Sequence, residues 1–585
     1  EPVPGAHIVS LTTTPRLRGD TLQVSVNATE AAGDQVEAIA YDGSRAVASA
    51  DGAAGQVLSL PVPHARLWSP SDPFLYGLTV RLLQDGHVVD AVGSYFGMRS
   101  ISIRSAGGVP KVMLNGKPIF MAGTLDQGYW PDGIYTAPTP GALRYDLLVQ
   151  KALGFNTVRK HMKVEPELWY YDADRLGLLV WQDMPAMVIA TPTPQAQAQF
   201  LTELHAMIET HVDHPSIVQW EPFNEGWGEF DPTGVTADVH AWDPSRLVDT
   251  VSGFNCCYSF GIDNGDVLDN HTYLGPGVQA PSGHQAAEDG EFGGLELVVP
   301  GHLWPGTPFA YEMEADSYVL TVRYVDLLSQ AGIEALHFGL NSAIYTAATD
   351  VENEVDGLLT YDRRVVKVDV AKVKAINRKD IAAGSRAPVP FGTYRDLPAA
   401  FDNVGITDAA NPIPGNYDGG GQSYDAAGLA AAGLAPGQKV TIDGVTVTWP
   451  DAPAGTPDNV VTGGQTILVN AKGRAMVVLG AATWAPNNYT ATGVITYTDG
   501  STQSYTLTFN DWAASTASTN SQVLTTSPSN VEPGSGASSR PVHVYADEIV
   551  LSRRKTVRSI TLPNVDDGIV GTPQVALHVF ALGVG

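Results

Sequence analysis

The chain has 585 residues, of which 44% are hydrophobic and 16% charged, and its formal net charge is −28. A chain of this length predicts roughly three or four domains. The negative charge argues against nucleic acids, anionic membranes and polyanionic polysaccharides, because like charges repel at long range. We therefore expect no nucleic acid partner and no membrane partner, and no apolar run approaches the roughly 18 residues of a membrane helix.

Residues 1–104 read as a small β-domain. Short β-rich runs such as TLQVSVNA and VEAIAYD alternate with Gly, Asp and Pro turns, and QDGH carries an Asp-Gly hairpin signal. This regular spacing predicts an immunoglobulin-like β-sandwich.

Residues 105–380 show a different rhythm, in which helices alternate with short apolar strands. Helical patterns cover 142–153, 166–176, 197–212 and 316–331, and the strand candidates are TVRKH, LLVWQDM, IVQWEPFNE, LVDTVSG, VLDNHTY, PFAYEM and ALHFGL. Repetition over this length predicts a (β/α)8 TIM barrel, whose chemistry lies at the carboxyl ends of the strands. Polar clusters fall at those ends: Arg159-Lys160-His161, Gln182-Asp183, Asn224-Glu225, His271 and Tyr273.

The last third of the chain follows a linker rich in Pro, Gly and Ala over 381–398. Residues 399–585 are poor in Lys and Glu, and runs such as KVTIDGVTVTWP alternate at period two. We predict a C-terminal β-sandwich. It either binds carbohydrate or is structural. The loop acids Asp402, Asp408 and Asp418 could hold Ca²⁺, although solvated turns are the preferred interpretation.

The only two cysteines, Cys256 and Cys257, are adjacent. Neighbouring cysteines can form only a strained eight-membered disulfide ring, which cannot join distant parts of a fold. We expect two thiols packed in a loop instead. The chain begins at Glu1 without a basic or apolar leader, and we expect that a signal peptide has been removed or was never present.

Glu225 is the first candidate for chemistry. It ends the segment Trp220-Glu221-Pro222-Phe223-Asn224-Glu225, in which an apolar strand leads into a loop rich in Gly and Trp. Cleavage of a glycosidic bond takes two carboxyl groups, one that protonates the leaving oxygen and one that attacks or stabilises the anomeric carbon. Asn224 could donate a hydrogen bond to a sugar hydroxyl. A capping Glu in a loop is the structural alternative.

The chain resembles glycoside hydrolase family 2 from about residue 60 to 375. The resemblance rests on LWSPSDPFLYGLTV, LNGKPIFMAG, LLVQKALGFNTVRKHMKVEP, YDADRLGLLVWQDMP, HPSIVQWEPFNEGWG, LDNHTY, GEFGGL and YTAATDVENEVDGLLTYDRRVVK, in the family's order. It implies a retaining mechanism through a covalent glycosyl-enzyme intermediate, with no cofactor and no metal. The acid/base then falls on Glu225 and the nucleophile on Glu291, in Glu-Phe-Gly-Gly. Glu312 and Glu314 are rivals as nucleophile.

Further pocket residues follow from the same resemblance. His271 and Tyr273 match a strand end where the Tyr hydrogen-bonds the nucleophile. Arg159 and His161 would orient the nucleophile or a hydroxyl, with a buried Arg–Asp brace as the alternative. Asp126 and Trp130 could form the wall of the non-reducing-end subsite, although Trp130 could equally be core. Asp183 ends a barrel strand and is a further candidate for substrate binding.

The acids Glu354 and Asp356 bear on the choice of sugar. They occupy the place where the family's glucuronidases read a carboxylate with Asn-x-Lys, and two acids there would repel a uronate. We therefore predict a secreted bacterial retaining exo-β-glycosidase that acts on terminal neutral sugars, such as a β-galactofuranosidase or β-galactosidase. The alternative is a non-catalytic glycan-binding protein on a hydrolase scaffold. The family's N-terminal jelly-roll is absent ahead of residue 1, so we expect either that a separate chain carries it as a partner or that this branch does without it.

We add two geometric expectations to this prediction. Glu225 should have a raised pKa, so that it is protonated for the first step. The carboxyl groups of Glu225 and Glu291 should be about 5–5.5 Å apart.

Overall fold

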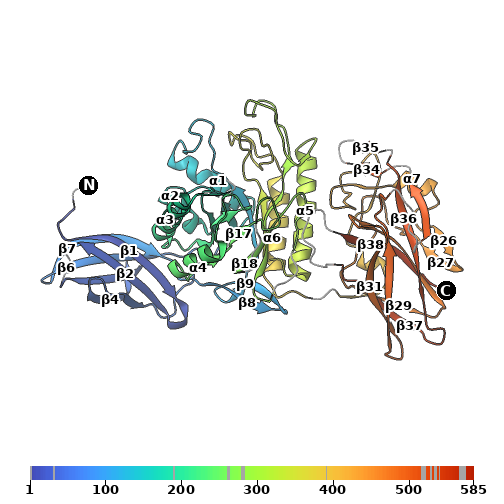
Figure 1. Cartoon of the computed structure of the whole chain (residues 1–585), viewed down its shortest axis with the longest axis horizontal. Helices are drawn as coiled ribbons and strands as arrows, with labels where there is room; N and C mark the ends of the chain where they lie inside the picture. Colours follow the sequence, from blue (N-terminus) through green and yellow to red (C-terminus); the bar gives the residue numbers. More distant parts are fainter. Residues whose placement is uncertain are drawn as a thin grey trace.

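The computed structural model of the chain describes residues 3–29, 33–188, 191–259, 264–278, 283–389, 392–514, 522–527, 530–532, 536–538, 540–565 and 575–585. Three bodies follow one another along its longest axis, with a barrel between two β-sandwiches (Figure 1). Within the described ranges, no helix combines the length and the apolar character that a membrane crossing requires.

The N-terminal body is an antiparallel sandwich, as predicted. One sheet has the order β1-β2-β5 and the other the order β4-β3-β6-β7. Along β2 every second residue is buried, which places Leu22, Val24 and Val26 in the core between the sheets. The strands are β1 His7–Arg16, β2 Thr21–Thr29, β3 Gln35–Asp42, β4 Arg45–Ala53, β5 Leu58–Pro61, β6 Tyr76–Gln84 and β7 His87–Phe96, with a 3-10 turn at Leu17–Gly19.

A small antiparallel sheet connects this sandwich to the barrel. It is built from β8 Ile101–Ala106, β9 Val109–Leu114 and β10 Lys117–Pro118. The buried Lys111 donates to the carbonyl of Leu340 at 2.9 Å, and the backbone of Val112 donates to Asn341 at 3.0 Å. The predicted boundary at residue 104 falls inside β8.

The central body is a TIM barrel. In the described part of the chain, eight parallel strands pair in the order β16-β14-β13-β12-β11-β22-β19-β18. They are β11 Met121–Asp126, β12 Thr157–Lys160, β13 Leu179–Asp183, β14 Ile217–Glu221, β16 Leu247–Val248, β18 Val267–Thr272, β19 Ala286–Gly293 and β22 Ser342–Thr346. Short parallel pairs extend the sheet at its rim: β15 Phe223–Asn224 with β17 Val251–Ser252, and β20 Leu295–Glu296 with β21 Glu312–Met313.

Helices cover the outside of the barrel (Figure 1). They are α1 Pro140–Ala152, α2 Glu167–Leu176, α3 Pro194–His211, α4 Pro232–Trp242, α5 Ser317–His337 and α6 Val370–Gly384. Local sequence sets where they begin, because Thr139 and Thr193 each cap a helix with the side-chain oxygen ahead of a Pro at the first helical position. The first three predicted helices agree with α1, α2 and α3 to within three residues.

Two strand predictions in the barrel are wrong. In PFAYEM only Glu312–Met313 is a strand, and it pairs with β20 at the rim. ALHFGL is not a strand, because α5 continues to His337 and the chain turns at Gly339, whose φ is +90°. The last barrel strand is Ser342–Thr346 instead.

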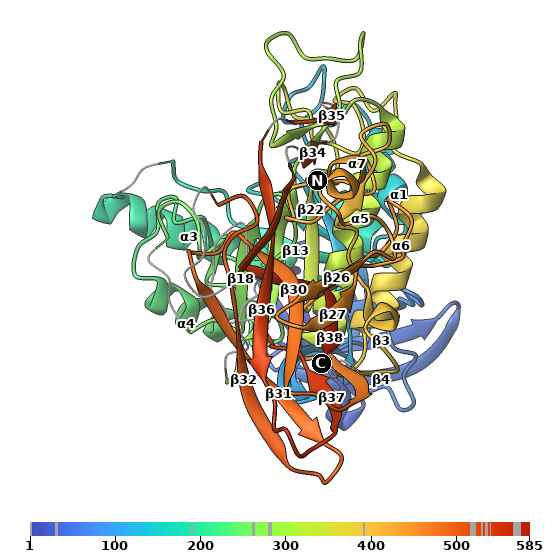
Figure 2. The same ribbon diagram turned by 90° about the vertical axis from the view of Figure 1, so that its right-hand side faces the viewer.

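The C-terminal body is a second sandwich, as predicted, and Figure 2 looks onto it. One sheet has the order β23-β29-β37-β31-β32 and the facing sheet the order β28-β38-β30-β36-β33. The strands are β23 Thr393–Tyr394, β29 Thr466–Ala471, β37 Val557–Thr561, β31 Tyr489–Tyr497, β32 Thr502–Phe509, β28 Val460–Val461, β38 Ala576–Val584, β30 Ala475–Thr483, β36 Val542–Val550 and β33 Gln522–Ser527. Smaller elements are the 3-10 turn Pro398–Ala400, β24 Ile406–Thr407, β25 Ser423–Asp425, α7 Ala426–Ala431, β26 Lys439–Ile442, β27 Val445–Thr448, β34 Asn530–Glu532 and β35 Gly536–Ala537.

The segment that joins barrel and sandwich is shorter than the predicted linker over 381–398. Helix α6 ends at Gly384, and β23 already pairs with β29. The loop acid Asp418 accepts hydrogen bonds from the backbone N–H groups of Gly420 and Gln422 in its own turn, and Asp402 accepts one from Val461 of β28. Among the described residues, the groups of His, Cys, Asp and Glu placed to share an ion all contain Glu225 rather than these acids.

Candidate active site

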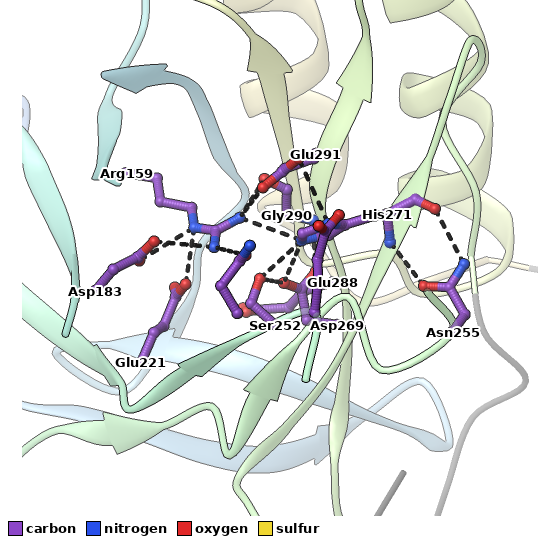
Figure 3. Close-up of polar contacts among 12 residues, drawn as sticks. Arg159, Asp183, Glu221, Ser252, Asn255, Asp269, His271, Glu288, Gly290 and Glu291 are labelled. Atoms are coloured by element: carbon purple, nitrogen blue, oxygen red, sulfur yellow. Dashed lines mark hydrogen bonds and ion pairs between the residues drawn. The ribbon is translucent and has the colours of Figure 1, made fainter. Parts of the chain in front are cut away.

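The predicted site residues gather at the carboxyl ends of the barrel strands, around Arg159 at the end of β12 (Figure 3). The guanidinium is completely buried. It lies 3.0 Å from Asp183, 2.8 Å from Glu221 and 3.1 Å from Glu291. Burial alone would lower the pKa of Arg159, but the surrounding carboxylates raise it well above its ordinary value, so the cation is retained.

Glu291 lies on β19 with a cation and a phenol against its carboxylate. Arg159 donates to one oxygen at 3.1 Å, and the hydroxyl of Tyr273 donates to the other at 2.7 Å. Tyr273 also bonds Thr346 at 3.1 Å, which fixes the direction of its hydroxyl. Both donors stabilise negative charge on Glu291, and this suits a nucleophile.

Glu225 faces Glu291 from the loop that follows β15. Its backbone has a φ of +52°, a conformation that few residues other than glycine adopt. The surroundings enforce it, since the N–H of Glu225 donates to Ser252 and its carbonyl accepts from Tyr258. A carboxylate oxygen of Glu225 lies within 4.8 Å of one from Glu291.

The pKa of Glu225 departs from our expectation. Burial favours the neutral acid, but the hydrogen bond from His271 at 2.8 Å and the charge of His271 outweigh it, so the pKa is lowered. The predicted raised pKa is therefore wrong for the free protein. The cause is a contact between two strand ends that are 46 residues apart in sequence.

His271 holds the proton that Glu225 lacks. Burial would lower its pKa, but Glu291, Glu225 and Asp269 together raise it. Its other ring nitrogen lies 2.9 Å from the hydroxyl of Ser252, which in turn donates to Asp269. A chain of polar groups thus runs from buried Asp269 through Ser252 to His271 (Figure 3). The other ring nitrogen of His271 continues it to Glu225.

Asn224 and His161 complete this side of the pocket. The amide oxygen of Asn224 accepts a hydrogen bond from Arg159 at 2.8 Å, which orients the amide. The amide nitrogen is then the group that can donate to a ligand. His161 lies 2.8 Å from Asp183, which also pairs with Arg159. Asp183 therefore bridges Arg159 and His161, in agreement with the Arg–Asp brace that we kept as an alternative.

Asp126 and Trp130 have partners within the protein. Asp126 is buried against Lys160 at 3.2 Å, and Lys160 also pairs with Glu165 at 2.8 Å. Trp130 is 7% exposed, and the guanidinium of Arg363 lies 4.0 Å from its ring centroid. Their predicted contacts with substrate stay predictions.

Acidic side chains and a tyrosine line the remaining wall. Burial, followed by repulsion from Glu291, raises the pKa of Glu354, and burial together with Glu354 raises that of the buried Asp356. The ring of Tyr311 stacks on Tyr273 with centroids 3.9 Å apart. Tyr311 was missed from sequence, because its segment PFAYEM was interpreted as a barrel strand.

The rival nucleophiles lie against helix α5. Arg323 donates to Glu312 at 2.7 Å and lies 3.9 Å from Glu314. Burial and Glu312 raise the pKa of Glu314 to about 8, which favours its neutral form. Glu291 is the acid that the structure places beside Glu225.

Cys256 and Cys257 are joined by a disulfide bond, so the expectation of two thiols is wrong. Their sulfur atoms lie within 4.8 Å of a carboxylate oxygen of Glu225. The sequence shows that the two residues are adjacent, but it carries no signal that they lie beside Glu225.

Comparison with known proteins identifies relatives of the first two bodies. The profile of Glycosyl hydrolases family 2 matches residues 6–99, and that of the Glycosyl hydrolases family 2 TIM barrel domain matches residues 110–263. A β-galactosidase of Aeromonas hydrophila is 31% identical over 281 residues, which cover 43% of this chain and 26% of the relative. A β-galactosidase of Erwinia tasmaniensis is 29% identical over 204 residues, covering 34% and 19%. Residues 6–99 and 110–263 therefore resemble the corresponding domains of glycosyl hydrolase family 2, and the chain spans about a quarter or less of the length of these relatives.

Solved structures share the fold. A β-glucuronidase from Ruminococcus gnavus in complex with uronic deoxynojirimycin has a TM-score of 0.52 at 19% identity, covering 64% of this chain and 68% of that one. A family 2 β-galacturonidase from Eisenbergiella tayi bound to galacturonate has a TM-score of 0.51 at 20% identity, covering 64% and 73%.

Proposed function

We propose that this chain is a retaining exo-β-glycosidase, with Glu225 as acid/base and Glu291 as nucleophile. The observation that carries the proposal is the approach of the two carboxylates to within 4.8 Å, with His271 against Glu225 and with Arg159 and Tyr273 against Glu291. A separation near 5 Å leaves no room for a water between them and the anomeric carbon, and this is typical of retaining enzymes. The related β-galactosidases support exo-action on a β-glycoside.

The reaction then proceeds in two displacements. An oxygen of Glu291 attacks the anomeric carbon while Glu225 gives its proton to the glycosidic oxygen, so that the leaving group departs as an alcohol. Glu225 then takes a proton from water as the water oxygen attacks the glycosyl ester. The sugar is released, and Glu291 is again a carboxylate. Asn224, whose oxygen is held by Arg159, is placed to donate its amide hydrogen to a sugar hydroxyl.

We further propose that the substrate is a neutral terminal sugar. Glu354 and Asp356 lie in the pocket wall, and Glu354 is close enough to Glu291 for each to repel charge on the other. A uronate would add a further negative charge there, which is unfavourable in a buried site. A β-galactofuranoside and a β-galactoside are the first candidates. Secretion is part of the same proposal, and the Cys256–Cys257 bond supports it, since disulfides persist in oxidising compartments.

The test is hydrolysis of a panel of nitrophenyl glycosides, covering pyranosides and furanosides in both anomers together with uronides. We expect one neutral β-glycoside to be turned over. Glu291→Gln should abolish turnover, and Glu225→Gln should reduce it by about 10²–10⁴-fold. The matched control is Glu312→Gln, because Glu312 pairs with Arg323 on the outer helix, and it should keep activity.

The same panel contains the outcomes that would contradict us. Loss of activity in Glu225→Gln together with full activity in Glu291→Gln would reject Glu291 as the nucleophile. Preferred turnover of a uronide would reject the neutral sugar. Well-folded wild type that turns over nothing would favour a glycan-binding protein on a hydrolase scaffold.

A further inference from the structure

The loop that carries the disulfide is held firmly against the acid/base residue. Asn255 makes two hydrogen bonds with the backbone of His271, at 2.9 and 3.0 Å (Figure 3). The N–H of Cys256 donates to Gly253, and the N–H of Tyr258 donates to the carbonyl of Glu225. The loop over 253–259 is therefore fixed by bonds to the same residues that perform the proposed chemistry.

This loop presents an apolar surface to solvent beside Glu225. Cys257 is exposed, Cys256 is half-buried and Tyr258 is 54% exposed. The edge of Trp227 packs against Tyr258 with ring centroids 4.7 Å apart, which fixes the tyrosine ring. Both sulfur atoms lie within 4.8 Å of the Glu225 carboxylate. An exposed apolar surface beside a proposed catalytic residue needs an explanation, because such surfaces mark binding sites.

The proposed chemistry supplies one. An acid that protonates the glycosidic oxygen must lie against the bond to the leaving group, so a surface next to Glu225 on the solvent side contacts that group. A disulfide has no N–H or O–H, and its sulfur atoms are polarisable and pack well against C–H faces and aromatic rings. The bond also keeps the two sulfurs side by side, so the surface is formed before the ligand arrives.

We propose that Cys256, Cys257 and Tyr258 form the binding surface for the leaving group, which is a sugar ring or an aromatic aglycone that places its C–H or ring face on the disulfide. This inference rests on the proposed role of Glu225. It assigns the disulfide to recognition of the group that departs, whereas the barrel interior around Arg159 binds the sugar that is retained.

Binding measurements test the proposal without turnover. The probes are thio-linked β-disaccharides and the corresponding methyl β-thioglycosides, each with galactose, galactofuranose, mannose or arabinofuranose at the non-reducing end, titrated by calorimetry. In the double variant Cys256→Ala/Cys257→Ala, and in Tyr258→Ala, we expect the Kd of the best disaccharide to rise about tenfold, or about 1.4 kcal/mol. The Kd of its methyl thioglycoside should stay within about twofold.

Tyr318→Ala is the matched control. Tyr318 is 58% exposed, much like Tyr258, but it lies in the first turn of α5. It should leave both affinities unchanged. Equal weakening of the disaccharide and the methyl thioglycoside, unchanged affinity in the double variant, or wild type that binds no disaccharide would each overturn the proposal. So would alkylation of both cysteines in the native protein without a reductant, followed by mass spectrometry.

The two proposals fail in different ways. A chain that binds the disaccharides through the disulfide surface but hydrolyses no glycoside would reject the proposed function and keep this surface. If the wild type hydrolyses glycosides and the double variant has the same affinity and activity for every leaving group, the proposed function stands and the disulfide surface is rejected.

Discussion

Arg159 is surrounded by more carboxyl groups than one cation can neutralise. Burial raises the pKa of Glu221, which also shares a hydrogen bond with Asp183. Burial works against the ionised form of Asp183 as well, but Arg159 and His161 outweigh it and lower the pKa of Asp183. Glu221 therefore holds a proton that it shares with Asp183, and the charge of Arg159 is left to Asp183 and Glu291. This sharing leaves the charge of a fully buried arginine to its contacts with Asp183 and Glu291.

The same division of protons explains Glu225. A free acid/base with a lowered pKa would be a poor proton donor if it were alone, but His271 lies 2.8 Å away with a raised pKa. The pair therefore carries one proton near neutral pH. When a sugar displaces water and buries the pair, the carboxylate loses its solvation and the proton can transfer to Glu225.

This proton sharing predicts the pH dependence of activity. Below the raised pKa of His271 the pair holds its proton, and above it the proton is lost, so the alkaline limb of kcat/KM should lie above pH ~6.5, the ordinary histidine value. In His271→Asn the proton can reside only on Glu225, so the limb should move to lower pH, and activity at pH 7 should fall by about 10–100-fold. A pH profile of kcat/KM for both proteins gives the answer. An unmoved alkaline limb in His271→Asn would contradict the shared proton.

At the scale of elements, the sequence predicts those whose pattern is local. Thr139 and Thr193 cap α1 and α3, Gly177 ends α2 in the left-handed conformation, and the three helices lie where expected. Strand β19 was not predicted as a strand, although it is buried along its whole length. It reads Ala-Ala-Glu-Asp-Gly-Glu-Phe-Gly, and its acids Glu288 and Asp289 have pKa values that burial raises. A strand whose buried residues are acids does not match an apolar pattern.

The site residues likewise fall into those that local sequence predicts and those that it does not. Glu225, Glu291, Arg159, His271 and Tyr273 lie at strand ends in recognisable segments, and the structure brings them together. Tyr311 and the Cys256–Cys257 bond lie on loops after other strands, and their positions depend on contacts over long stretches of chain. The lowered pKa of Glu225 likewise depends on a neighbour that local sequence does not reveal.

Gly226 links the acid/base to the disulfide loop. Its φ is +72°, and a Cβ there would lie 2.1 Å from the backbone carbon of Tyr258. We predict that Gly226→Ala pushes the loop over 253–259 away from Glu225. The free energy of unfolding should fall by about 1–3 kcal/mol, and kcat/KM should fall by about tenfold or more. Chemical denaturation and steady-state kinetics measure the two effects.

Gly86 provides the control for that substitution. It also has a positive φ, +78°, but a Cβ there meets nothing within 4 Å. Gly86→Ala should therefore show only the conformational cost, with unchanged kcat/KM. Full activity in Gly226→Ala would mean that the close approach of the two backbones does not position Glu225.

At the scale of the whole molecule, the C-terminal sandwich is joined to the barrel by polar contacts as well as by the chain. Asp326 of α5 hydrogen-bonds Asn416, and the guanidinium of Arg323 lies so close to Gly421 that a Cβ there would be 3.1 Å from it. The segment Asn-Tyr-Asp-Gly-Gly-Gly that begins at Asn416 thus docks on the outer helix of the barrel. Gly421 permits this close approach, because a side chain there would crowd Arg323.

Buried acids in this sandwich predict how its stability depends on pH. Burial raises the pKa of Asp402 to about 7, against an unfolded value of about 3.9. The folded state therefore binds this proton more tightly, so the contribution of Asp402 to stability is complete below pH ~4 and is lost as the pH rises through about 7. We predict that the sandwich unfolds at a lower urea concentration at pH 8 than at pH 5, and that Asp402→Asn removes part of this decline. Asp408→Asn, at an exposed loop acid, should keep the whole decline. If Asp402→Asn unfolds with the same pH dependence as wild type, the buried acid that governs the decline must lie elsewhere, and Asp458, whose pKa burial also raises to about 7, would be the next to replace.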